Sequence, residues 1–260
     1  MSTKLKNAPL YYVLADVRFG AVESMEKFIP EFQESLRNNN FPDFKEETVK
    51  NVNIRDIGDG QPIINTDDRK RWIFNNIDIT AGFILFHDRL IFHTTSYDTF
   101  KTFSEDLRTG LECLNSVIKI SFIKRTGIRY VDLILPVENE KIESYLKESL
   151  LGFNINDGIR QQSIVETLSN IQNGTLISRS AIFENGLNFP PDLIPLVIKP
   201  NQKFERAEYK TNAILDADHY IERRFKYDLD EIVSQLDSSH KITGDLFRSS
   251  ITEYALTKWK

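Results

Sequence analysis

The segment "KRTGIRYVD", residues 124–132, places two arginines and an aspartate in a stretch that otherwise has the composition of a β-strand. Successive side chains of a strand point to opposite faces, so we expect Arg125 and Arg129 on one face and Asp132 on the other. Two guanidinium groups beside Gly127, which permits close approach, have the geometry to bind a carboxylate or a phosphate. The pattern favours the alternative, in which these charges face solvent or form structural ion pairs.

Two further segments mix basic and aromatic residues, "DDRKRWIF" (67–74) and "HYIERRFKY" (219–227). Such segments can follow a phosphate backbone while a base stacks on a ring. Both also contain acidic residues, and the formal net charge of −5 disfavours nucleic-acid binding by the surface as a whole. The sequence therefore favours solvated strand ends here. The candidate binding residues in these segments are Arg69, Arg71, Trp72, Arg223 and Arg224.

The histidines do not predict a metal site. His219 lies between Asp216 and Asp218 in the chain, but strand alternation points it to the opposite face. His87 and His93 lack further ligands at a suitable spacing, and His240 falls on the apolar side of an expected helix. We therefore expect no metal, no cofactor and no catalytic residue, the more so because nucleophile-elbow, phosphate-loop and dinucleotide-binding motifs are absent from the sequence.

The composition is that of an ordinary folded protein, with 40% hydrophobic residues and a single cysteine, Cys113. One cysteine cannot form an intramolecular disulfide, and its apolar helical surroundings favour a buried thiol in a reducing compartment. The sequence shows no signal peptide and no stretch long and apolar enough for a membrane span. We therefore expect a cytoplasmic protein.

Residue periodicity predicts a strand at 9–19, an amphipathic helix that Pro30 kinks or restarts, and a weak strand at 44–56. Residues 57–68 have loop composition. Three further strands follow within 71–97, with a hairpin at His87–Arg89, and a long helix capped by Ser96 or Asp98 continues to residue 118.

The second half repeats this order of elements. A strand at 118–136 and a short helix over "NEKIESYLKESLL" precede extended stretches near 161–169, 174–184 and 203–226. A long helix from Leu229 then leads to a final short turn begun by Ser250. The sequence thus predicts an α+β fold of two similar halves, 1–117 and 118–260, each a mainly antiparallel sheet covered by helices, or one continuous domain.

Three segments carry a resemblance to a known family: "NAPLYYVLADVRF" (7–19), "RTGIRYVDLILP" (125–136) and "LDEIVSQLDSSHKITGDLFRSSITEYALTKW" (229–259). They resemble, in the same order, landmarks of a sporadically distributed family of uncharacterised bacterial proteins. The resemblance implies a gene in a host-defence, toxin-antitoxin or mobile-element locus, and it supplies no catalytic residues. Arg125 and Arg129 fit the central landmark, whereas Asp132 stands where the resemblance implies Asn.

The preferred hypothesis is a non-enzymatic binding or regulatory component that recognises a protein partner, with homo-oligomerisation left open. One alternative is an apolar small-molecule site between a long helix and the sheet, lined by phenylalanine-rich strands. The other is nucleic-acid binding or processing by Arg125, Arg129 and the two basic-aromatic segments.

Overall fold

The computed structural model describes residues 5–55, 63–153, 156, 158–186, 189–194, 196–205 and 210–260, with the backbone alone for 50–55 and 63–67. The strands in these residues are β1 (Leu10–Phe19), β2 (Asp43–Arg55), β3 (Ile63–Asn75), β4 (Ala81–Leu85), β5 (Arg89–Thr94), β6 (Phe122–Ile134), β7 (Gln162–Ile171), β8 (Gly174–Phe183) and β9 (Asn212–Lys226). The helices are α1 (Ile29–Arg37), α2 (Phe100–Ile118), α3 (Leu229–Ser250) and α4 (Glu253–Trp259). The predicted α+β class is therefore confirmed.

Within the described residues the strands form one antiparallel sheet of nine, in the order β2-β3-β4-β5-β1-β6-β9-β8-β7. The first strand of each predicted half, β1 and β6, pair with each other near the middle of the sheet. Each also pairs on its other side with the last strand before the long helix, β5 for β1 and β9 for β6. The strands of both halves thus share one sheet.

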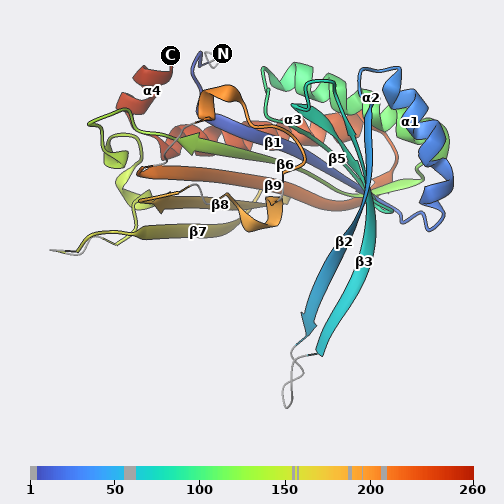
Figure 1. Cartoon of the computed structure of the whole chain (residues 1–260), viewed down its shortest axis with the longest axis horizontal. Helices are drawn as coiled ribbons and strands as arrows, with labels where there is room; N and C mark the ends of the chain where they lie inside the picture. Colours follow the sequence, from blue (N-terminus) through green and yellow to red (C-terminus); the bar gives the residue numbers. More distant parts are fainter. Residues whose placement is uncertain are drawn as a thin grey trace.

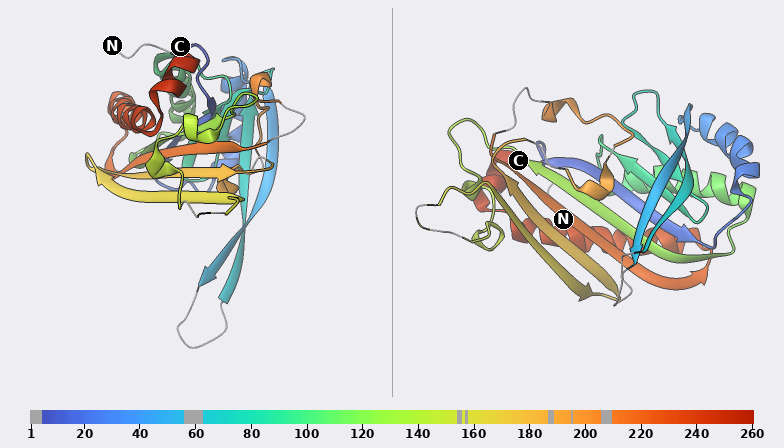
Figure 2. Two further views of the ribbon diagram at one scale, coloured as in Figure 1. Left: turned by 90° about the vertical axis from the view of Figure 1, so that its left-hand side faces the viewer. Right: turned by 60° about the horizontal axis from the view of Figure 1, so that its bottom comes forward.

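Helices α1, α2 and α3 lie on one face of this sheet (Figures 1 and 2). Apolar residues of α2 such as Leu107, Leu111 and Leu114 belong to one core cluster with Val13 and Ile128 of the central strands. Burying a side chain of this size stabilises a fold by about 1.5–3 kcal/mol. Docking of the helices therefore follows from the apolar stripes that the periodicity predicts.

The opposite face of the sheet is partly covered by the loop between β8 and β9. Phe189, Ile198 and Phe204 of this loop pack in one cluster with Tyr12 and Val131. A third cluster, at the end of the sheet nearest the termini, joins α4 to β6, β8 and β9. The sheet consequently has a helix-covered face and a partly open face.

Strands β2 and β3 leave the sheet as a two-stranded ribbon (Figures 1 and 2). They pair with each other from Asp43–Asn75 to Arg55–Ile63, whereas β3 pairs with β4 only from Trp72 to Asn75. We call residues 47–55 of β2 and 63–71 of β3, which pair with each other but not with β4, the β2–β3 ribbon. No described third strand supports it.

Several predicted elements are confirmed. Residues Leu85 and Leu90 pair across the hairpin predicted at His87–Arg89. A 3-10 turn at Met25–Phe28 precedes α1, whose first turn contains Pro30, so the proline marks a helix start as predicted. A first helical turn tolerates proline because its N–H groups have no partner within the helix.

Other boundaries were predicted wrongly. Residues 141–150 form two 3-10 turns, Ile142–Ser144 and Glu148–Leu150, in place of a helix. Strand β3 extends into the segment predicted to be a loop, of which residues 57–62 lie outside the described part. The cap of α2 is Thr99, and that of α4 is Thr252 in place of Ser250. Side-chain oxygens at the extended residue directly before a helix reach its free N–H groups, so position decides among candidate caps.

Candidate functional site

Arg129, a candidate from the central strand, is buried in an ion-pair network on the sheet face opposite the helices. Its Nε and Nη2 donate to the two carboxylate oxygens of Asp216, both at 2.7 Å, and its Nη1 donates to Asp192. Arg179 donates to Asp216 at 3.1 Å and pairs with Glu166. Although burial alone would raise it, hydrogen bonds from Arg129 hold the pKa of Asp192 below its ordinary value. Arg129 therefore ties the β8–β9 loop to the sheet.

The basic-aromatic segments contain residues that already have partners. Trp72 is 1% exposed and donates its Nε1 hydrogen to Glu46, so its ring lies in the core rather than on a base-stacking surface. Arg71 donates to Glu47. Arg223 pairs with Glu231, and Arg224 lies over the ring of Phe122.

Arg125 and Arg69 are the remaining arginines among the predicted binding residues. Arg125 lies over the ring of Tyr220, with its guanidinium carbon 3.7 Å from the ring centre, and its Nη1 is 3.9 Å from Glu222. Arg69 is an exposed residue of β3. The structure therefore does not bring the eight candidates together at one place.

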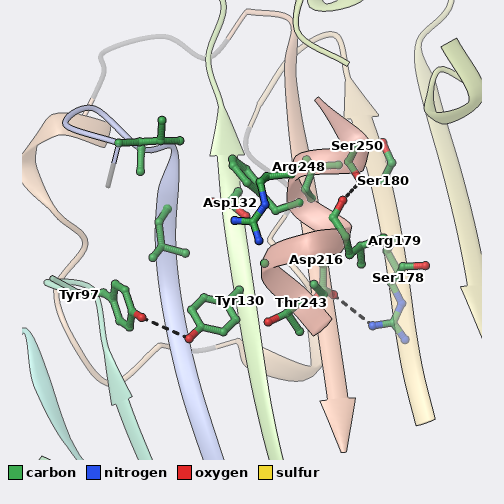
Figure 3. Close-up of a pocket in the computed structure, with 18 of the residues that line it drawn as sticks. Tyr97, Tyr130, Asp132, Ser178, Arg179, Ser180, Asp216, Thr243, Arg248 and Ser250 are labelled. Carbon is green, nitrogen blue, oxygen red and sulfur yellow. Dashed lines mark hydrogen bonds and ion pairs between the residues drawn. The ribbon is translucent and has the colours of Figure 1, made fainter. Parts of the chain in front are cut away.

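A cavity of about 430 Å³ lies between the C-terminal half of α3 and the helix-covered face of the sheet. Small residues face each other across it: Ser178, Ser180 and Ala217 on the strands, and Thr243 and Gly244 on α3. Large side chains at these positions would fill the space, because protein interiors otherwise pack densely. We call this space the α3 cavity; Figure 3 shows its lining.

Asp132 is the most unusual residue in the lining of the α3 cavity. Its side chain projects from β6, it is 6% exposed, and no described residue donates a hydrogen bond to its carboxylate or forms an ion pair with it. Burial raises the pKa of Asp132 to about 7, with the charge of Lys203 opposing the shift and that of Asp216 adding to it. A buried carboxylate is normally paired. Asp132 therefore offers an unused hydrogen-bonding group to the cavity.

Two basic groups of the cavity lining, Lys203 and Arg248, hydrogen-bond to groups other than Asp132. Lys203 donates from Nζ to the carbonyl oxygen of Ala8 at 2.8 Å. Arg248 donates to Asp245 at 2.7 Å. These two cations therefore donate hydrogen bonds to other acceptors and not to Asp132.

A chain of three rings, Tyr97, Tyr130 and His240, belongs to the lining of the cavity; Figure 3 shows the two tyrosines. The hydroxyl of Tyr130 lies 2.8 Å from Nδ1 of His240 and 3.4 Å from the hydroxyl of Tyr97. Burial lowers the pKa of His240, and the ring stacks on Phe100 with centroids 4.7 Å apart. Neutral rings of this kind can both donate and accept hydrogen bonds.

The predicted opposition of His219 to its acidic neighbours is confirmed: Asp216 binds Arg129, whereas Nδ1 of His219 lies 2.8 Å from Oγ of Ser239 on α3. His93 lies 2.9 Å from the hydroxyl of Tyr12, and burial lowers its pKa to about 3. Among the described residues, no group of three or more His, Cys, Asp and Glu is placed to hold a metal ion. Within the same part of the chain, no helix has the length and apolar character to cross a membrane.

No protein-family model matches this chain, and no curated protein matches it either. The resemblance to a sporadically distributed bacterial family therefore stays a prediction.

The structure confirms the predicted alternation of β6: Arg129 lies on the face opposite the helices, and Asp132 lines the cavity on the other face. The α3 cavity was missed as a specific site, because its lining comes from segments distant in sequence. A possible signal was the run of small and polar residues "SSHKITGD" (238–245), which interrupts the apolar stripe of α3. Small residues on an inward helical face permit a cavity.

Proposed function

We propose that this protein binds a small molecule with an apolar body and a hydrogen-bond-donating head group, preferably an amine, in the α3 cavity. The single observation that carries the proposal is Asp132, a carboxylate buried in the wall of the cavity without a described donor. An ammonium group would supply the missing charge and hydrogen bonds. The proposal refines the sequence-based alternative of an apolar ligand between helix and sheet.

The rest of the cavity supports a ligand of mixed character. Apolar side chains line it from β1, β9, α3 and α4, and they include Leu10, Leu215, Phe247 and Leu256. Hydroxyl groups of Ser178, Ser180 and Thr243 offer further polar contacts on its walls. Apolar walls with a few convergent polar groups are typical of small-molecule sites.

A matched pair of probes tests the head-group preference. Phenethylamine and phenethyl alcohol share an apolar body and differ in the charged group, so isothermal titration at pH 8 should show tighter binding of the amine by about tenfold. Asp132→Asn should abolish that difference. Ala217→Phe, which fills the cavity, should weaken binding of both probes.

Native mass spectrometry of protein purified from its own host supplies a second readout. A co-purified small molecule that is lost from the Ala217→Phe variant would support the proposal. Equal binding of amine and alcohol, together with a ligand-free protein from the host, would refute it.

We also propose, as a second candidate function, that the β2–β3 ribbon binds a protein partner. Two paired strands without a third are marginal in isolation and expose backbone hydrogen-bonding groups along their edges. The projection of the ribbon from the sheet makes these edges accessible to another chain (Figure 1). Pull-down from the native host with full-length and ribbon-shortened protein tests this function; equal partner recovery would contradict it.

The equivalent positions of the first strand, the last strand and the long helix support a further proposal, that the two halves arose by duplication. In each half the first strand pairs with the last one, and the long helix follows directly. A cytoplasmic location, a role in a defence or mobile-element locus and a non-enzymatic role stay predictions.

A further inference from the structure

Three arginines lie side by side on three neighbouring strands: Arg89 on β5, Arg18 on β1 and Arg125 on β6. Arg18 is the direct partner of both others in the strand register, so the three side chains share one face of the sheet. This is the face opposite the helices, because the neighbouring Val17 belongs to the helix-covered core. We call these residues the arginine row.

The arginine row is only partly neutralised by the protein. Nε of Arg18 donates to Asp16 at 3.0 Å, and Nη1 of Arg89 is 3.8 Å from the same carboxylate. Arg125 is 3.9 Å from Glu222, and its Nε is buried without a hydrogen-bond partner among the described residues. Like charges directly opposite each other destabilise a sheet. The row therefore favours an added anion.

A hollow of about 390 Å³ lies beside two members of the row, Arg18 and Arg125, and extends to β9; Arg89 is not part of its lining. Arg18 and Arg125 line it with Lys124, Arg223 and Arg224, while Asp88 and Glu222 are the acidic residues of its lining. Stacking on aromatic rings fixes the guanidinium planes of Arg125 and Arg224, with distances to the ring centres of 3.7 and 3.9 Å. Planar cations held in place in this way lose little freedom on binding an anion.

We propose that this hollow binds a compact polyphosphate anion, with two or three linked phosphate groups, between Arg18, Arg125 and the arginines of β9. The arginines of the lining lie on β1, β6 and β9, three neighbouring strands about 4.8 Å apart, so they span roughly 10 Å and present several guanidinium groups to one ligand. A single phosphate would contact only some of them. The two acidic residues at the hollow disfavour an extended nucleic-acid strand, which must continue past them. This site is independent of Asp132 and the α3 cavity.

Isothermal titration of the full chain with inorganic tripolyphosphate tests the proposal. Loss of a charged hydrogen-bonding group costs about tenfold in affinity, so Arg125→Gln and Arg18→Gln should each weaken binding by about that factor. Glu222→Gln removes a competing carboxylate from an exposed position and should tighten binding. Arg37→Gln, on an exposed pair of α1, should change nothing.

Two other probes identify the ligand class. Inorganic phosphate should bind at least about tenfold more weakly than tripolyphosphate, since it engages fewer guanidinium groups. Tighter binding of a deoxythymidine oligonucleotide than of tripolyphosphate would overturn the proposal in favour of nucleic acid. Absence of tripolyphosphate binding, or binding that Glu222→Gln and Arg125→Gln leave unchanged, would overturn it altogether.

Discussion

At the scale of single residues, two neighbouring positions of one strand have opposite electrostatic situations. Arg129 is surrounded by carboxylates, and its charge is used to hold a loop. Asp132, three positions along, is buried without a described donor. Stability measurements should therefore respond in opposite ways to removal of the two charges.

We expect Arg129→Ala to lower the free energy of unfolding by about 3 kcal/mol, because the buried carboxylate of Asp216 loses two hydrogen bonds and keeps only the one from Arg179. Urea unfolding measures this change. The control Arg37→Ala removes an exposed ion pair with Glu34 and should cost less than about 1 kcal/mol. Equal stability of the two variants would show that the Arg129 network is not structural.

We expect the ligand-free protein to lose stability as pH rises towards 7, and Asp132→Asn to lack this loss. In the unfolded chain an aspartate loses its proton near pH 4. In the folded protein Asp132 keeps it until about pH 7. The folded state therefore binds more protons than the unfolded state between these pH values. The stability that protonated Asp132 contributes is fully present below pH 4 and is lost as pH rises through 7.

Above pH 7, Asp132→Asn should have a free energy of unfolding up to about 4 kcal/mol higher than that of the parent. This is the free energy that corresponds to the difference between the folded and unfolded pKa of Asp132. Urea unfolding at pH 5, 6, 7 and 8 gives the slope. The exposed Asp230 provides the control Asp230→Asn, which should retain the parent's slope. An unchanged slope in Asp132→Asn would assign the pH dependence to other groups.

At the scale of the element, helix ends depend on a particular side chain rather than on a suitable residue nearby. Thr99 is extended, and its side chain accepts a hydrogen bond from the N–H of Thr102. Ser96, which the sequence also offered, is exposed three residues earlier. The two hydroxyl residues therefore allow a matched comparison.

Thr99→Ala should cost about 1 kcal/mol, since the first turn of α2 loses its cap. Ser96→Ala should stay within about 0.5 kcal/mol of the parent. Thermal and urea unfolding of both variants give the difference. A larger cost for Ser96→Ala would mean that the helix begins earlier in solution.

At the scale of the whole molecule, the sheet and its helices form the body, and the β2–β3 ribbon is an attachment to it (Figure 1). Val49 and Arg69 are directly paired, so a two-residue Asn-Gly turn can replace residues 50–68. We expect the shortened protein to unfold within about 5 °C of the parent, because the removed part has no described third strand. Calorimetry measures this; a large fall would show that the ribbon supports the body.

By itself the sequence determined most of the strands and long helices, because the β-branched and aromatic residues of "YYVLADVRF" and the apolar stripe of α2 reflect local burial. It also determined that Asp132 and the arginines face opposite ways, since strand geometry fixes that. Only the tertiary structure decided what each face meets. Strand order placed Arg18 and Arg89 beside Arg125, and the docking of α3 left a cavity at Asp132. Both outcomes depend on contacts between distant segments, which local patterns do not encode.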